Sequence, residues 1–144
     1  MKMYDVIIVG GGLAGLTTAI DLSSSGLEVL LIEKDKYPKH KVCGEYVSNE
    51  VLPYLERLGV NIESTLADQI QRLVLSNASG SSVKVSLPLS GFGISRYALD
   101  ELLYRTAISQ GVTFKFETVA EIDFKDDRFL VKTNTNNYYS ELSI

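Results

Sequence analysis

The chain has 144 residues, of which 45% are hydrophobic and 22% charged, a composition typical of a globular domain rather than a disordered or fibrous chain. Its 14 basic and 18 acidic residues give a formal net charge of −4, so no overall basic field is present to hold nucleic acid. No apolar run reaches the roughly 18 residues of a membrane span and no signal peptide is evident, so we expect a cytoplasmic protein. With a single Cys43 and a single His40 we expect neither an internal disulfide nor a metal site.

The start of the chain has the pattern of a strand, a helix and a second strand. Residues 4–9 are almost continuously apolar and stop at three consecutive glycines, as expected of a strand buried on both faces. Residues 13–25 carry apolar side chains at helical spacing, and Gly26 supplies the left-handed position that ends a helix. Residues 29–32 form a second buried strand. The sequence therefore predicts a βαβ unit with a right-handed crossover, and an α/β fold.

The next segment is polar and irregular. Residues 34–47 contain several lysines without periodicity, and we expect a solvated loop there. Ser48 can cap a helix that runs to about Leu58 and ends at Gly59, and Pro53 should kink this helix because proline lacks a backbone donor.

A hairpin and a second long helix follow. Residues 70–75 and 83–87 alternate apolar and polar side chains around the turn-forming residues 77–80, which predicts an antiparallel hairpin. Ser95 then caps a helix with apolar side chains at helical spacing, ended by Gly111.

The last quarter of the chain predicts strands. Residues 112–116, 119–124 and 129–133 have strand character, and residues 138–144 look like one more strand in which the chain ends. We therefore expect the fold to continue past the C-terminus of this sequence.

Three glycines carry the clearest chemical motif. Gly10, Gly12 and Gly15 have the spacing G-x-G-x-x-G directly after a buried strand and at the start of a helix. This spacing allows a tight turn, the approach of backbone N–H groups to a pyrophosphate, and close packing of helix on sheet. The phosphates would lie at the helix N-terminus, where N–H groups are unpaired. A glycine-rich turn can also serve packing alone, and that alternative stays open here.

Glu33 strengthens the nucleotide interpretation. It lies 18 residues after Gly15, at the end of the second strand, where an acidic side chain can accept hydrogen bonds from both ribose hydroxyls of an adenosine. The alternative is an exposed acid at a strand end. A carboxylate here would repel a 2′-phosphate, which disfavours NADP but does not separate FAD from NAD.

Several segments resemble one family. Residues 5–15, with residues 31–33, resemble the FAD-binding start of flavoprotein monooxygenases and geranylgeranyl reductases. The loop from Lys41 to Glu45, followed by Ser48, is similar to the loop of the reductase branch. The Ser95-Arg96 pair with its following leucines is similar to a helix motif of both branches.

The resemblance implies FAD as the cofactor and a set of residues around it. The glycines would hold the pyrophosphate, Glu33 the adenosine ribose, and backbone groups near Val119 the adenine. The loop with Cys43 would lie near the flavin ring, although a lone cysteine is by default a small buried hydrophobe. The expected cofactor-binding residues are Gly10, Gly12, Leu13, Ala14, Gly15, Glu33, Lys34, Cys43, Gly44, Arg96 and Val119. No catalytic residue is assigned.

The resemblance also implies a fold and a function. We expect a Rossmann-like FAD/NAD(P)-binding βαβ fold with an added antiparallel hairpin region, residues 1–144 being the N-terminal part of an FAD-binding domain without its substrate domain. The implied function is an FAD-dependent oxidoreductase of the geranylgeranyl reductase type, which reduces double bonds of a prenyl or polyene lipid by hydride transfer from the flavin. It would need a small-molecule or lipid substrate, an external electron donor such as NAD(P)H, and at most peripheral membrane contact. The alternatives are a non-catalytic dinucleotide-binding fragment or subunit, an FAD-dependent aromatic monooxygenase and, ranked last, an NAD-dependent dehydrogenase.

Overall fold

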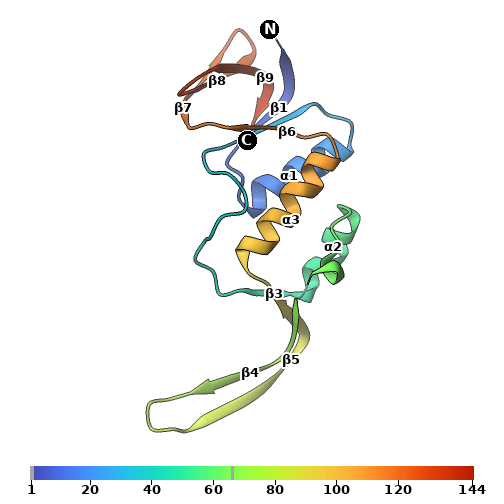
Figure 1. Ribbon diagram of the computed structural model, residues 1–144, viewed down its shortest axis with the longest axis vertical. Helices are drawn as coiled ribbons and strands as arrows, with labels where there is room; N and C mark the ends of the chain where they lie inside the picture. Colours follow the sequence, from blue (N-terminus) through green and yellow to red (C-terminus); the bar gives the residue numbers. More distant parts are fainter. Residues whose placement is uncertain (1, 66) are drawn as a thin grey trace. The chain divides into compact units, whose positions relative to one another are not determined.

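The computed structural model describes residues 2–65 and 67–144, which divide into two units (Figure 1). The first unit comprises residues 2–40 and 97–144, and the second comprises residues 41–65 and 67–96. The glycine turn and Glu33 both belong to the first unit.

The first unit contains a six-stranded sheet in the order β6-β2-β1-β9-β8-β7. Strands β6, β2, β1 and β9 pair in parallel, whereas β7, β8 and β9 form an antiparallel meander. Numbered by their appearance, the parallel strands have the order 3-2-1-4 of nucleotide-binding folds. The predicted Rossmann-like fold class is therefore confirmed. The strands are β1 (Met3–Val9), β2 (Val29–Glu33), β6 (Thr113–Phe116), β7 (Val119–Lys125), β8 (Arg128–Thr133) and β9 (Asn137–Ser143).

Two helices accompany these strands. Helix α1 (Leu13–Ser24) begins directly after the glycine turn, and α3 (Arg96–Ser109) precedes β6. Both helices end near a glycine with positive φ, at Gly26 (φ +88°) and Gly111 (φ +93°), as the sequence predicts. None of the helices in the described part of the chain has both the length and the apolar character that a membrane crossing requires.

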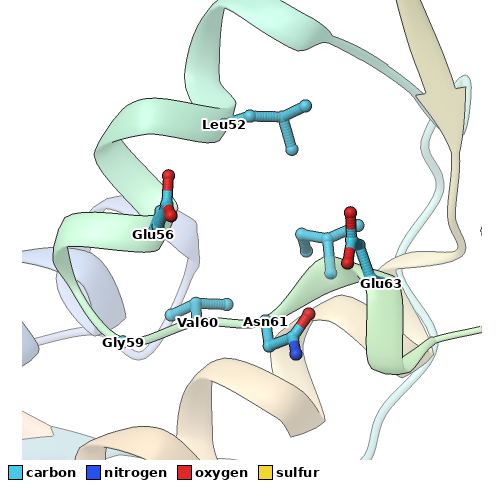
Figure 2. A pocket seen from close by; sticks show the side chains of 7 residues that line it. Leu52, Glu56, Gly59, Val60, Asn61 and Glu63 are labelled. Carbon is cyan, nitrogen blue, oxygen red and sulfur yellow. The ribbon is translucent and has the colours of Figure 1, made fainter.

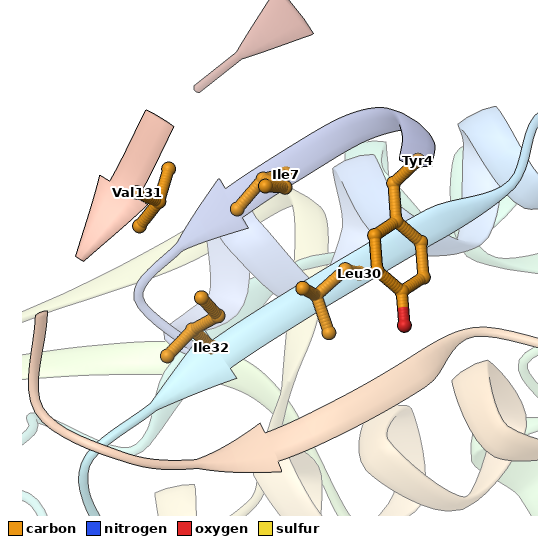
Figure 3. Packing of buried hydrophobic residues seen from close by; sticks show 5 residues of the cluster. All are labelled: Tyr4, Ile7, Leu30, Ile32 and Val131. Carbon is orange, nitrogen blue, oxygen red and sulfur yellow. The ribbon is translucent and has the colours of Figure 1, made fainter. Parts of the chain in front are cut away.

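A cluster of buried side chains ties the meander to the βαβ unit (Figure 3). Val131 of β8 is fully buried against side chains of β1 and β2. Strand β9 joins the same sheet beside β1, with Tyr139 opposite Met3 and Ser143 opposite Ile7. The last strand is thus an inner strand of the sheet. The members of this cluster are Tyr4, Ile7, Leu30, Ile32 and Val131.

The second unit contains the predicted hairpin as part of a three-stranded sheet in the order β3-β5-β4. Its turn is fixed by Asn77, whose Oδ1 accepts hydrogen bonds from the backbone N–H groups of Ser79 and Ser81. The elements of this unit are β3 (Tyr46–Ser48), η1 (Asn49–Val51), α2 (Leu52–Arg57), η2 (Ile62–Ser64), β4 (Asp68–Ser76) and β5 (Ser82–Gly93).

Two sequence predictions for this unit are wrong in detail. The loop ends before Tyr46 rather than after residue 47, because β3 pairs with the C-terminal end of β5. Ser48 caps the short 3₁₀ helix η1, and the α-helix begins only at Leu52. Pro53 then lies in the first turn of α2, where a backbone donor has no partner within the helix, so proline is accommodated there.

The packing of Val131 generates a stability prediction. Val131→Ala removes buried methyl groups and leaves a cavity, so we expect the free energy of unfolding to fall by about 1–3 kcal/mol. Val42→Ala is the matched control, because Val42 is fully exposed and its loss should change stability by less than about 0.5 kcal/mol. Urea unfolding measures both. Equal effects of the two substitutions would contradict a core that includes β8.

Candidate nucleotide-binding site

A pocket of about 240 Å³ opens at the carboxyl ends of the parallel strands in the first unit. Ligands of open α/β sheets bind at this edge, because the turns that follow the strands present backbone groups there. The volume is below the roughly 300–1,000 Å³ of a whole small-molecule site, so it suits one part of a dinucleotide. The residues that line it are Val9, Gly10, Ile32, Glu33, Lys34, Glu117, Thr118 and Val119.

The glycine turn has the geometry that a phosphate requires. Gly10 has a φ of +107°, and a Cβ added to Gly15 would lie only 1.9 Å from the carbonyl oxygen of Gly10. Gly12 is the N-cap of α1 but offers no side chain to the first helical N–H groups, and the first turn carries no acidic residue. Leu13 and Ala14 are the first two residues of that turn. The helix N-terminus therefore presents donors and a positive partial charge to an anion.

Glu33 is buried, with 7% of its surface exposed, so the alternative of an exposed strand-end acid is wrong. Its Oε2 accepts a hydrogen bond of 2.7 Å from the N–H of Gly11. Its Oε1 accepts one of 3.1 Å from the N–H of Asp35 and lies 2.6 Å from Nζ of Lys39. Burial alone would raise the pKa of this carboxyl, but its three hydrogen bonds outweigh burial and hold the pKa below its ordinary value.

These contacts limit what Glu33 can still accept. A carboxylate has about four lone-pair sites, and three of them are occupied by these contacts. One site remains, on Oε2, which suffices for a single ribose hydroxyl. Binding of both ribose hydroxyls, as the sequence predicts, would require the Lys39 ammonium or the Asp35 N–H to move away.

A second carboxylate borders the pocket and was not foreseen from the sequence. Glu117 accepts hydrogen bonds from Oγ1 of Thr133, Nδ2 of Asn136 (2.9 Å) and the hydroxyl of Tyr138 (2.8 Å). Burial favours a higher pKa for Glu117, but these hydrogen bonds outweigh it and lower the pKa. Burial and the bond to Glu117 together raise the pKa of Tyr138 to about 12. The network therefore fixes the segment between β6 and β7 at the pocket edge.

Tyr37 and Lys39 are the other contributors that sequence reasoning missed. They lie in the polar loop after β2, where no periodicity distinguishes one side chain from the next. The hydroxyl of Tyr37 donates a hydrogen bond of 2.6 Å to the carbonyl of Gly11, and Lys39 pairs with Glu33. One signal for these contacts was present in the sequence: Gly11 is a glycine at a position where the motif G-x-G-x-x-G accepts any residue.

The other expected residues divide between the two units. Lys34 and Val119 line the pocket together with Gly10 and Glu33. Cys43, Gly44 and Arg96 belong to the second unit, and their role at a cofactor stays a prediction. Cys43 is exposed, with Sγ accepting a hydrogen bond of 3.4 Å from the N–H of Glu45, so a buried, hydrophobe-like cysteine is excluded.

The second unit has its own hollow of about 470 Å³ (Figure 2). Two carboxylates, Glu56 and Glu63, border it, and none of the expected cofactor-binding residues does. Its acidic border makes it unsuited to a phosphate-bearing ligand. The residues that line it are Leu52, Glu56, Gly59, Val60, Asn61, Ile62 and Glu63.

The lowered pKa of Glu33 predicts a pH-dependent contribution to stability. A group with a depressed pKa in the folded state stabilises the fold above its unfolded-state pKa, and this contribution is lost as the pH falls through the folded-state pKa. Glu33→Gln should therefore lower the free energy of unfolding by about 2 kcal/mol at pH 7, and the difference from wild type should shrink below about pH 4.5.

Urea unfolding over a pH series measures this difference. Glu28→Gln serves as the control, because Glu28 is exposed and its Lys2 partner is 3.7 Å away. A Glu33→Gln deficit that stays constant down to pH 3 would contradict a stabilising role of the Glu33 charge.

Comparison with known proteins places this site in a family. A family model described as an FAD binding domain matches residues 3–136. The chain is 32% identical over 110 residues to digeranylgeranylglycerophospholipid reductase 1 of Methanopyrus kandleri, covering 75% of this chain and 28% of the relative. It is 32% identical over 131 residues to tryptophan 2-halogenase of Chondromyces crocatus, covering 85% of this chain and 24% of the relative.

A solved structure shows the same fold. The p-nitrophenol 4-monooxygenase of Pseudomonas putida superposes with a TM-score of 0.87 at 18% identity, over 99% of this chain and 40% of that protein. The chain spans about a third or less of the length of the curated relatives it matches, from 24% to 35%. Because the family model covers nearly the whole chain and the glycine turn lies within it, the chain belongs to the FAD binding domain family, with FAD as its cofactor.

Proposed function

We propose that this chain is the FAD-binding part of an FAD-dependent oxidoreductase, with residues 1–144 forming the N-terminal part of its FAD-binding domain. The observation that carries the proposal is the placement of Glu33 beside the glycine turn, at the carboxyl ends of β1 and β2. An adenosine ribose and a pyrophosphate need these two groups side by side. The share of each relative that the chain spans supports a longer enzyme.

The residues of the chain fit the cofactor in three respects. Gly15 leaves the space against Gly10 that any side chain would fill. The uncapped first turn of α1 offers backbone donors for the pyrophosphate. Glu33 keeps one lone pair for a ribose hydroxyl. Bound FAD would supply redox chemistry, whereas these residues bind and orient it.

For the substrate, we propose reduction of carbon–carbon double bonds in a prenyl or polyene lipid, with an external electron donor such as NAD(P)H and peripheral contact with a lipid surface. The similarity to a digeranylgeranylglycerophospholipid reductase supports this class of substrate. The resemblance of the Cys43-Gly44-Glu45 loop to the reductase branch also supports it.

A second candidate is an FAD-dependent monooxygenase or halogenase acting on an aromatic substrate. The similarity to a tryptophan 2-halogenase favours it. The two candidates differ in what consumes the electrons: an unsaturated lipid in the first and molecular oxygen in the second. A non-catalytic dinucleotide-binding module is the third possibility, and it would bind FAD without turnover.

The cofactor site predicts specific effects on FAD affinity. We expect the purified chain to bind FAD, Gly15→Ala to abolish binding because its Cβ would collide with the Gly10 carbonyl, and Glu33→Ala to weaken binding about tenfold or more. Glu28→Ala is the control and should bind as wild type. Flavin fluorescence titration gives the affinities, and circular dichroism verifies that each variant is folded. A folded wild-type chain that binds no FAD would contradict the proposal.

The substrate proposal is tested on the longer enzyme of which we propose this chain to be a part, loaded with FAD and reduced anaerobically. We expect a polyprenyl lipid to reoxidise the flavin, with a product that gains two hydrogen atoms for each reduced double bond. Absorbance at the flavin band and mass spectrometry of the lipid measure this. Reoxidation only by oxygen, with a hydroxylated or halogenated aromatic product, would instead establish the second candidate.

A further inference from the structure

Gly11 lies between the glycines of the motif, and its surroundings leave no room for a side chain. A Cβ added at Gly11 would lie 1.7 Å from the hydroxyl oxygen of Tyr37, 3.0 Å from Cζ of the same ring and 3.1 Å from Cβ of Glu33. The Tyr37 hydroxyl donates a hydrogen bond of 2.6 Å to the carbonyl oxygen of Gly11. The requirement for glycine at this position is therefore set chiefly by the Tyr37 hydroxyl, with a second tight contact to Glu33.

Both polar groups of Gly11 are held from outside the turn. Its N–H donates to Oε2 of Glu33 at 2.7 Å, and its carbonyl accepts from Tyr37. In a planar trans peptide the C=O and the following N–H point in opposite directions. Fixing the Gly11 carbonyl therefore also fixes the direction of the Gly12 N–H, on the side away from Tyr37.

The Tyr37 ring is itself held by aromatic packing. It stacks on Tyr104 of α3 with centroids 4.6 Å apart and an interplanar angle of 21°. The rings of Phe114 and Phe116 of β6 approach it edge-on at 6.4 and 6.2 Å. Nζ of Lys39 lies 5.5 Å from the centre of the Tyr37 ring and reaches Glu33. The position of the hydroxyl thus depends on α3 and β6 and not on the loop alone.

We propose that Tyr37 is a positioning residue of the cofactor site: its hydroxyl orients the Gly11–Gly12 peptide so that the Gly12 N–H faces the pyrophosphate of FAD. This inference rests on the proposed cofactor site and adds to it a residue outside the motif. In this arrangement the glycine turn is set for phosphate before the ligand arrives, which lowers the ordering cost of binding.

If Tyr37 only anchored its loop, its substitution would lower the affinity of the pocket for all ligands equally. Tyr37 instead orients the Gly12 N–H, which donates a hydrogen bond to the phosphate. Tyr37→Phe should therefore lower the affinity for ADP roughly fivefold, the equivalent of one ordinary hydrogen bond, and leave the affinity for adenosine unchanged. Tyr97→Phe removes a hydroxyl from a half-exposed tyrosine of the same unit and is the control, with wild-type affinity for both ligands.

A second arm uses the close approach at Gly11. Gly11→Ala should abolish ADP binding and lower the melting temperature, because its Cβ overlaps the Tyr37 hydroxyl. Adding Tyr37→Phe removes that oxygen and leaves the ring carbon 3.0 Å and Cβ of Glu33 3.1 Å away, two contacts that shifts of a few tenths of an ångström relieve. The double variant Gly11→Ala/Tyr37→Phe should therefore melt at a higher temperature than Gly11→Ala alone.

Isothermal titration calorimetry with ADP and adenosine, together with thermal unfolding of all variants, tests the inference. Selective weakening of ADP in Tyr37→Phe, with rescue of Gly11→Ala melting by Tyr37→Phe, supports it. Equal weakening of both ligands, or wild-type ADP affinity in Tyr37→Phe, overturns it while leaving the cofactor site intact. A folded wild-type chain that binds neither ADP nor FAD overturns the cofactor site, whatever the melting temperatures show.

Discussion

The hydrogen bond between the Glu33 carboxylate and the N–H of Gly11 is the interaction on which the site depends. It joins the end of β2 to the turn after β1, so the Glu33 carboxylate and the backbone groups of the glycine turn lie together at one edge of the sheet. A carboxylate that is 7% exposed needs partners, because an unpaired buried charge is costly. Lys39 supplies the countercharge at 2.6 Å. Glu33 therefore serves two purposes at once: it holds the glycine turn in place and keeps one lone pair for a ligand.

The rest of the first unit keeps this contact rigid. The parallel order β6-β2-β1-β9 brings the ends of β1, β2 and β6 to the same edge. The close approach of Gly15 to the Gly10 carbonyl sets the start of α1, and Tyr37 sets the Gly11 carbonyl. On the other side of the pocket the Glu117 network fixes the segment that leads into β7. The binding site thus consists largely of backbone groups that side chains hold in place. This is typical of proteins in which the cofactor supplies the chemistry and the protein binds and orients it.

Local sequence patterns predicted much of this fold, because apolar runs and glycines indicate its first strand, first helix and second strand. The pairing of β9 with β1 was not predictable, since it joins residues more than 130 positions apart and only tertiary packing selects it. The sequence predicts a kink at Pro53 because Ser48 is a good helix cap, whereas a 3₁₀ helix intervenes and α2 begins only at Leu52, so that Pro53 lies in its first turn. Tyr37 and Lys39 were missed because their loop has no periodicity, and their role arises only when the loop folds back on Gly11.

The site described above requires FAD to bind with its pyrophosphate at the first turn of α1 and its adenosine ribose at Glu33. A crystal structure of the chain with FAD bound tests this most directly. We expect phosphate oxygens within hydrogen-bond distance of the N–H groups at Gly12 to Ala14, and one ribose hydroxyl on Oε2 of Glu33 with Lys39 still in place. FAD bound elsewhere on the chain, with the Glu33 carboxylate and the glycine turn unoccupied, would contradict it.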